Sequence, residues 1–320
     1  MSLDLIAFGS TFLELVFGHV PRLPGPGEEI FTEELALSCG GAITVADAAA
    51  RSGARAGLAV RLGSDLGSRI VEEHSLRAGI DLSPSIRVAW PTAGVTIVLN
   101  FDGDRAFISH LPPGRAEEPP EAERWLAVLR EVRPTWCYLH AGAGIAPLLR
   151  QARSIGVKIA LDCSLAAIET SRDAVIDCAL LADVLVPNES ELARLTGLDE
   201  VHPAASSAMR WCSTLVVKRG AKGALAVHDH ETEEVTAGLR RVRVRDRTGA
   251  GDAFAGAMIG ALAQGVPLLD AVAAGNAAGS DAVARLGGVG EVEVEGFAFP
   301  AAEATRNLRA LLVPLDEEAP

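Results

Sequence analysis

The sequence predicts an α/β protein with a doubly wound, mostly parallel sheet and a smaller β-sheet beside it. Between Arg133 and Lys218, short apolar runs alternate with longer segments of helical periodicity. This rhythm is typical of the strands and helices of a parallel sheet. Two other segments alternate apolar and polar residues on either side of Asp102-Gly103-Asp104, which indicates a β-hairpin. The hairpin does not fit the strand–helix rhythm, so we expect it in a separate small sheet.

The individual elements follow in chain order. The first strand is expected at Leu3–Phe8, ending at Gly9, and a second at residues 29–37. Ser38-Cys39-Gly40-Gly41 opens a helix that reaches Arg51. The hairpin strands are expected at 94–101 and 105–110. In the alternating region we expect strands or helices at 135–140, 145–154, 157–162, 171–181, 184–187, 189–195 and 215–218. A basic strand at 239–245 precedes an Ala-rich helix at 253–263, and later helices are expected at 268–285 and 303–312.

Length, charge and cysteine content exclude several classes of protein. A chain of 320 residues suffices for one large α/β domain and a small appendage. A net charge of −13 argues against a nucleic-acid groove, which needs clustered Lys and Arg. No apolar run has signal or membrane-spanning length, so no membrane partner is expected. Five cysteines without a close pair indicate a reduced, cytoplasmic protein with buried thiols and no zinc site.

The stretch Gly249-Ala250-Gly251-Asp252 carries the strongest chemical signal. It joins a basic segment to an Ala-rich helix that stops at Gln264-Gly265-Val266-Pro267. Glycines at a helix N-terminus let an anion approach free backbone N–H groups, and the helix dipole favours its charge. Asp252 would lie beside this anion hole, where its carboxylate could accept a proton from an attacking hydroxyl. A simpler interpretation is that Asp252 only complements the helix dipole.

The longer string from Asp246 to Phe254 resembles the C-terminal signature of the ribokinase-like (PfkB) carbohydrate kinases. Asp-Thr-Thr-Gly-Ala-Gly-Asp is the usual form in that family, and only Arg247 departs from it. The resemblance spans nearly the whole chain. It implies a ribokinase-like fold, ATP as phosphoryl donor, Mg²⁺, a sugar-like substrate, and the small sheet as a lid over the sugar. In that interpretation Asp252 is the general base, and Gly249, Ala250 and Gly251 form the anion hole.

The same resemblance implies a set of substrate-binding residues. Glu14 stands where these kinases usually have an Asp that binds sugar hydroxyls. The best alignment places Cys39 and Gly40 on a paired-glycine signature, and a shift of one residue places Gly40 and Gly41 there. Thr44 falls on the usual sugar-binding Asn, and a hydroxyl replaces an amide there. Arg105 on the hairpin and His140 at a strand end are further candidate contacts. The structural alternatives are a solvated carboxylate for Glu14, a glycine turn before a core helix for the Gly40 segment, and a packed histidine for His140.

The family's nucleotide and metal elements also have counterparts. Asn188 and Glu191 match an Asn-x-x-Glu element that orders Mg²⁺ through water, although Asn188 could simply cap a helix. Lys218, Gly220 and Gly223 match a Lys-x-Gly-x-x-Gly turn near the phosphates, or form a plain turn between strands. The resemblance further assigns Thr248 and Asn276 to ATP. Asp246 is the candidate for a monovalent cation, with K⁺ expected.

The resemblance also sets expected domain boundaries. We expect the ATP-binding α/β core at residues 1–14, 38–90 and 111–320, and the lid at 15–37 and 91–110. In many relatives this lid pairs two subunits, and an exposed small sheet makes a homodimer through the lid a reasonable expectation.

Four functional hypotheses stay open at this point. The first is an ATP-dependent sugar kinase, favouring a neutral sugar because Asp162-Cys163-Ser164-Leu165-Ala166 lacks the Asn and Arg of keto-deoxy-gluconate kinases. A nucleoside kinase of the same fold is the second. A non-catalytic sugar- or nucleotide-binding regulator is the third. The least favoured is an NAD-dependent oxidoreductase, based on Gly142-Ala143-Gly144, where Pro147 replaces the third glycine of a dinucleotide fingerprint.

Overall fold

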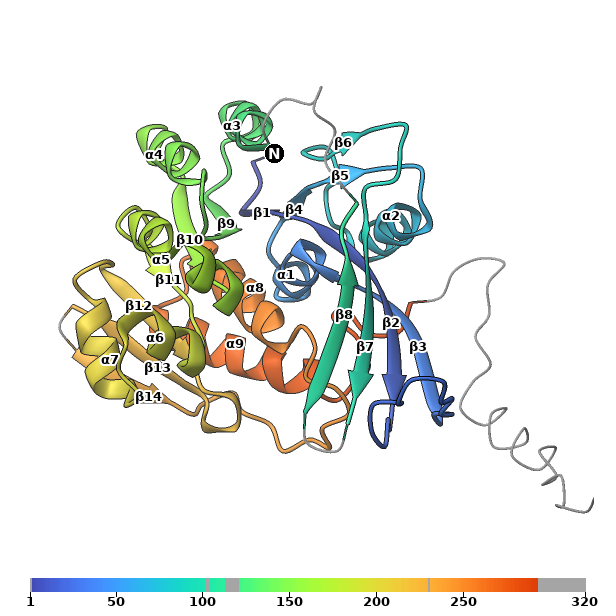
Figure 1. Ribbon diagram of the computed structural model, residues 1–320. Coiled ribbons are helices and arrows are strands. Elements are labelled where there is room, and N and C mark those ends of the chain that lie inside the picture. The colour runs from blue at the N-terminus through green and yellow to red at the C-terminus, as the bar shows by residue number, and fades with distance from the viewer. Residues whose placement is uncertain (1, 102–103, 113–120, 230, 293–320) are drawn as a thin grey trace, which may run out of the picture.

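The computed structural model describes residues 2–101, 104–112, 121–229 and 231–292. Its centre is an eight-stranded sheet with the order β14-β13-β12-β11-β10-β9-β1-β4 (Figure 1). These strands are β1 (Leu5–Phe8), β4 (Ala56–Ala59), β9 (Trp136–His140), β10 (Lys158–Asp162), β11 (Val184–Leu185), β12 (Thr214–Lys218), β13 (Ala224–His228) and β14 (Glu231–Val235). All pairs from β4 to β12 are parallel, and only the β12–β13 and β13–β14 pairs are antiparallel. The predicted mostly parallel α/β fold is confirmed.

Helices cover both faces of this sheet. One face carries α1 (Ala42–Arg51), α2 (Leu66–Ala78), α8 (Ala250–Ala263) and α9 (Leu268–Ala282). The other carries α3 (Glu121–Val132), α4 (Ala146–Ser154), α5 (Leu165–Ala179), α6 (Glu189–Thr196) and α7 (Val201–Ala208). Along β1, Leu5 and Ala7 enter the first core, whereas Ile6 and Phe8 enter the second. Burial on both faces explains why the parallel strands read as continuous apolar runs.

A four-stranded sheet, called the small sheet below, stands beside this core (Figure 1). It contains β2 (Thr11–Gly18), β3 (Glu34–Gly41), β7 (Gly94–Asn100) and β8 (Arg105–His110) in the order β3-β2-β7-β8. The predicted hairpin is therefore present as β7 and β8, and its Asp102-Gly103 turn lies outside the described residues. Glu14 pairs with Ser38 on one side and Thr96 on the other. Two short strands, β5 (Arg61–Leu62) and β6 (Ile86–Arg87), form a separate pair.

Helices α1 and α8 pack closely enough that glycine is required at their contact. A Cβ added to Gly256 would lie 2.2 Å from the Val45 carbonyl oxygen and 3.0 Å from the Ala48 Cβ. Helix α1 begins directly after Gly41, and α8 begins directly after Gly249. The contact therefore fixes the two glycine turns of the sequence relative to one another.

Three predicted elements differ from the structure. The segment expected at 171–181 is part of α5, which begins at Leu165 and ends at Ala179. The strand expected at 29–37 begins at Glu34 and continues to Gly41, so the Gly40-Gly41 pair ends a strand and the helix starts at Ala42. The basic strand expected at 239–245 is wrong, since that segment pairs with no strand in the described structure. Instead the Arg245 N–H donates to the Val283 carbonyl at the end of α9. The helix expected at 303–312 lies outside the described residues.

The expected state of the thiols is confirmed. All five cysteines are buried and free of disulfides. In the part of the chain that the structure describes, no helix combines the length and apolar character needed to cross a bilayer.

Candidate active site

Polar side chains converge where the parallel strands end. His140 ends β9, Asp162 ends β10 and Lys218 ends β12, while Asp252 lies in the first turn of α8. The Lys218 Nζ lies 2.5 Å from Asp162 Oδ2, and the His140 Nε2 lies 4.0 Å from Asp252 Oδ1. The carboxyl edge of a parallel sheet is where α/β proteins bind their ligands. We take this edge as the candidate active site.

The turn before α8 has the geometry of an anion site. Gly249 adopts a φ of 70° as the N-cap residue, and a Cβ there would lie 2.7 Å from the Gly288 Cα. Glycine is needed both for this left-handed backbone and for this close approach. The helix then begins at Ala250, so the N–H groups of its first turn have no carbonyl of the same helix to bond. Together with the helix dipole, they favour an anion at this point.

Asp252 lies in an environment suited to a base. Burial raises the pKa of its carboxyl, the His140 imidazole lowers it, and the nearby Asp162 carboxylate raises it again; the net direction is upward. The Lys218 ammonium and a hydrogen bond from Tyr138 also lower the pKa of Asp252, by smaller amounts. A raised pKa makes the ionised carboxylate a better proton acceptor, and the Lys218 ammonium favours that ionised form.

Lys218 lies between the sheet and the Gly249–Gly251 turn before α8. Its ammonium bonds to Asp162, whose Oδ2 also accepts from the Tyr138 hydroxyl at 3.2 Å. Burial opposes its charge, but the Asp162 and Glu191 carboxylates raise the pKa of Lys218 overall. A Cβ on Gly251 would lie 3.4 Å from the Lys218 Nζ. A fixed positive charge therefore lies against the turn that precedes α8.

Glu14 and Thr44 both lie beside Gly288, in the loop after α9. The Glu14 Oε2 accepts from the Gly288 N–H at 2.9 Å, and only 6% of the residue is exposed. Burial is the main cause that raises the pKa of Glu14 to about 7. A Cβ on Gly40 would come within 2.0 Å of the Glu14 Oε1, so a larger residue there would displace the Glu14 carboxyl. The Thr44 Oγ1 is buried and has no hydrogen-bond partner among the described residues.

The Asp246 carboxylate accepts hydrogen bonds from two loops, one before α8 and one after α9. Its Oδ1 accepts from the Thr248 N–H at 2.9 Å and from the Thr248 hydroxyl at 2.7 Å, and its Oδ2 accepts from the Gly287 N–H at 2.8 Å. The residue is 2% exposed. These contacts connect Thr248, which precedes the Gly249–Gly251 turn, to the loop after α9. They occupy Thr248 with a structural bond and leave Asp246 a buried carboxylate of the kind that a monovalent cation could share.

The Asn188–Glu191 element forms a capping box at the start of α6. Asn188 Oδ1 accepts from the Glu191 N–H, and Glu191 Oε2 accepts from the Asn188 N–H, each at 2.8 Å. Glu191 nevertheless faces the site, because ligand atoms of Asp162, Cys163 and Glu191 all lie within 4.8 Å of one another. Two carboxylates at this spacing suit a hard cation that keeps several waters, so the residues fit Mg²⁺.

The remaining predicted residues are more scattered. Gly220 and Gly223 flank the 3₁₀ turn after β12. The Asn276 side chain donates to the Val235 and Ala237 carbonyls, so its amide holds α9 to the segment after β14. Arg105 lies at the start of β8 and lines a separate cavity. The structure thus brings Asp252, His140, Lys218 and Glu191 to one edge but leaves Arg105 and Asn276 outside that group.

Two residues at the centre of the site were not predicted from the sequence. Tyr138 is buried within β9, and its hydroxyl contacts both Asp162 and His140. A single tyrosine inside an apolar strand gives no sequence signal. Asp162 did carry one, since it ends a predicted strand in the same way as Lys218.

The comparisons with known proteins identify the family. Residues 33–293 match the model of the "pfkB family carbohydrate kinase". The chain belongs to the PfkB carbohydrate kinase family. It is 28% identical over 284 residues to a cytidine kinase of Thermococcus kodakarensis, covering 85% of this chain and 93% of that protein. It is 26% identical over 271 residues to a deoxyribokinase of Salmonella typhi, covering 79% and 84%.

A solved structure supports the same fold. The ribokinase of Arabidopsis thaliana complexed with ribose and ATP superposes with a TM-score of 0.70 at 22% sequence identity, covering 96% of this chain and 99% of that one. The predicted ribokinase-like fold and kinase class are confirmed. The dinucleotide interpretation of the Gly142 segment is replaced by this assignment, and the family is one of sugar and nucleoside kinases.

Proposed function

We propose that this protein transfers the γ-phosphoryl group of ATP to a hydroxyl of a sugar or sugar-like substrate. One observation carries the proposal. Asp252, a carboxylate with a raised pKa, lies in the first turn of α8 beside the Gly249–Gly251 anion turn and the Lys218 ammonium. A base, an anion hole and a fixed cation at one point are what phosphoryl transfer requires.

In this mechanism each residue has a defined task. Asp252 accepts the proton of the attacking hydroxyl, which forms a bond to the γ-phosphorus as the bond to the leaving ADP breaks. The N–H groups of the turn stabilise the charge on the transferred group, and Lys218 adds a positive charge from the sheet side. Asp162 and Glu191 would hold Mg²⁺ through water, and the ion when bound neutralises phosphate charge.

The acceptor is proposed at the level of a class. Glu14 and the Thr44 hydroxyl, which has no hydrogen-bond partner among the described residues, lie beside Gly40 and Gly288, where they could bind acceptor hydroxyls. The cytidine kinase and deoxyribokinase similarities support both a nucleoside and a free sugar. We favour a neutral sugar at the reacting end, because the segment after Asp162 lacks the Asn and Arg expected for keto-deoxy-gluconate. A K⁺ ion beside Asp246 belongs to the same proposal.

The decisive experiment measures ADP release with ATP, Mg²⁺ and K⁺ against sugars, sugar acids and nucleosides. We expect a substrate-dependent rate that falls roughly 10²–10⁴-fold in Asp252→Asn. Circular dichroism and stabilisation by ATP should stay at the wild-type level in that variant. Near-normal turnover in Asp252→Asn would remove this residue from the mechanism. ATP stabilisation without turnover of any acceptor would favour a binding or regulatory protein instead.

We also propose that the protein works as a homodimer in a reducing compartment such as the cytoplasm. Five buried free thiols support the compartment. Exposed apolar residues on the small sheet support the dimer.

A further inference from the structure

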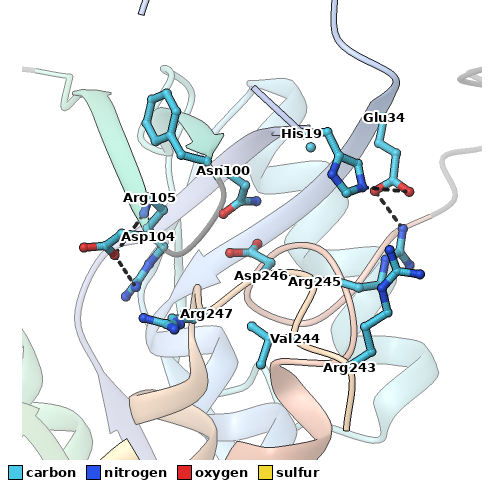
Figure 2. A pocket seen from close by; sticks show the side chains of 12 residues that line it. His19, Glu34, Asn100, Asp104, Arg105, Arg243, Val244, Arg245, Asp246 and Arg247 are labelled. Atoms are coloured by element: carbon cyan, nitrogen blue, oxygen red, sulfur yellow. Dashed lines mark hydrogen bonds and ion pairs between the residues drawn. The ribbon is translucent and has the colours of Figure 1, made fainter. Parts of the chain in front are cut away.

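A cavity of about 330 Å³ separates the small sheet from segment 243–247 (Figure 2). On the sheet side, Asn100 of β7 pairs directly with Arg105 of β8. On the opposite side lie Asp246 and Arg247, which precede Thr248 and the Gly249–Gly251 anion turn. The cavity therefore adjoins the proposed active site, but none of the functions assigned above uses it as a whole.

Two buried donors in this cavity lack acceptors. Asn100 is 6% exposed, and its Nδ2 has no hydrogen-bond partner in the described part of the chain. The Arg105 Nε is likewise buried without a hydrogen-bond partner there. Buried polar groups are nearly always paired, because an unpaired one loses its hydration without compensation. Both orphans are N–H donors on one row of the sheet, so the missing partner is an acceptor.

Positive charge around the cavity exceeds what the neighbouring acids neutralise. Four arginines line it: Arg105, Arg243, Arg245 and Arg247. Glu34 Oε2 forms an ion pair with Arg245 Nη2 at 3.0 Å, and Asp104 Oδ1 lies 3.7 Å from Arg105 Nη1. Asp246 directs its oxygens to the N–H groups of Thr248 and Gly287. Arg243 and Arg247 have no ion pair with any described residue.

We propose that this cavity binds the carboxylate or phosphate of a small anionic molecule between Arg247 and the Asn100–Arg105 pair. An oxyanion supplies several acceptors at once, and guanidinium groups bind carboxylate and phosphate oxygens through paired N–H donors. Figure 2 shows Arg105 from the sheet and Arg247 from the turn directed to the same side of the cavity. The anion would join the two parts of the molecule that border the active site.

The test titrates inorganic phosphate into the full chain by calorimetry, with chloride at equal ionic strength as reference. We expect saturable binding in the wild type and at least a tenfold loss in Arg105→Gln and in Arg247→Thr. Asn100→Leu keeps the size and removes the orphan amide. It should lose phosphate affinity to the same extent and, without phosphate, melt at the wild-type temperature or above it.

Arg241→Gln serves as the matched control, because Arg241 is exposed, carries the same charge and does not line the cavity. This control should keep wild-type affinity. Phosphate bound only at the Gly249–Gly251 turn would be insensitive to Asn100→Leu and Arg105→Gln. The proposal is overturned by that insensitivity, by absence of saturable binding in the wild type, or by an equal loss in Arg241→Gln.

The oxyanion can belong to the far end of the acceptor or to a separate molecule, and a second arm distinguishes these sources. Ribose and ribose 5-phosphate are compared as acceptors in the wild type and in Asn100→Leu. An anion on the acceptor gives at least a tenfold fall in the ratio of kcat/KM for the phosphorylated to the neutral sugar, and inorganic phosphate then competes with the acceptor. A separate anion leaves that ratio unchanged, and phosphate binding does not compete. Failure of all turnover with phosphate binding intact would reject the kinase proposal alone.

Discussion

Glu14 is a carboxyl group whose ionisation should be coupled to folding. Burial raises its pKa from 4.5 to about 7, and the nearby Asp246 and Asp252 carboxylates act in the same direction. Between pH 4.5 and about 7, the Glu14 carboxyl of the folded protein keeps a proton that the unfolded chain releases. Its contribution to stability is therefore fully present below pH 4.5 and is lost as the pH rises through 7.

This linkage gives a prediction for Glu14→Gln, which keeps the shape and removes the titration. The variant should gain stability over the wild type as the pH rises from 4.5 to 8, by roughly 3 kcal/mol in total. Urea unfolding at several pH values measures the difference. Glu131→Gln, on an exposed carboxylate, is the control and should show no such trend. A wild-type–variant difference that is constant with pH would contradict the assigned burial of Glu14.

At the scale of elements, the contact between α1 and α8 determines whether the two glycine turns face one another. A Cβ on Gly256 would overlap the Val45 carbonyl, which is backbone and cannot turn aside. Gly256→Ala should therefore push the helices apart and destabilise the fold by about 1–3 kcal/mol. Turnover should fall as well, because Asp252, the proposed base on α8, moves relative to Gly40 and Gly41 before α1.

Urea unfolding and the ADP-release assay measure these two effects. Gly142→Ala is the matched control, because no atom lies within 4 Å of a Cβ built there. This control should change stability by less than about 0.5 kcal/mol. If Gly256→Ala behaved like the control, the close approach of α1 and α8 would not be a constraint on the fold.

The same elements show what the sequence could predict. Strands β9, β10 and β12 were expected within one residue of their observed starts, because apolar runs between helical segments have few other interpretations. The segment 239–245 alternates equally well but has no strand beside it, since β14 already ends the sheet. Alternation of apolar and polar residues shows that a segment has two different faces, but the segment forms a β-strand only if another strand lies beside it.

For the candidate site, short motifs pointed to Asp252, Lys218 and Glu191, since each ends a strand or lies in the first turn of a helix. The assignment of Asn276 to ATP stays a prediction, and in the structure its amide donates to the Val235 and Ala237 carbonyls. The Asn100 amide, which has no hydrogen-bond partner within the described structure, carried no signal in the sequence. Hydrogen-bond satisfaction depends on which segments meet in space, and a single sequence does not contain that information.

At the scale of the whole molecule, the small sheet exposes an apolar face away from Glu14. The register places Val95, Ile108 and Leu35 on the face opposite to Glu14, with 38%, 61% and 36% of each residue exposed. Strands β3 and β8 are also unpaired edges of this sheet. An apolar face with open edges favours association with a second copy.

Sedimentation equilibrium tests this dimer, and Ile108→Glu should weaken it at least about tenfold, since a charge would be buried in an apolar contact. Leu180→Glu, an equally large change at an exposed leucine after α5 on the far side of the core (Figure 1), is the control and should leave association intact. Circular dichroism should be the same for both variants. A wild type that sediments as a monomer, or equal weakening by Leu180→Glu, would show that the small sheet acts without a partner. The opposite face of this sheet carries Glu14 and Asn100. Loss of the dimer should therefore also lower the affinity for the acceptor. A loss of association without any change in the KM for the acceptor would show that assembly and substrate binding are independent.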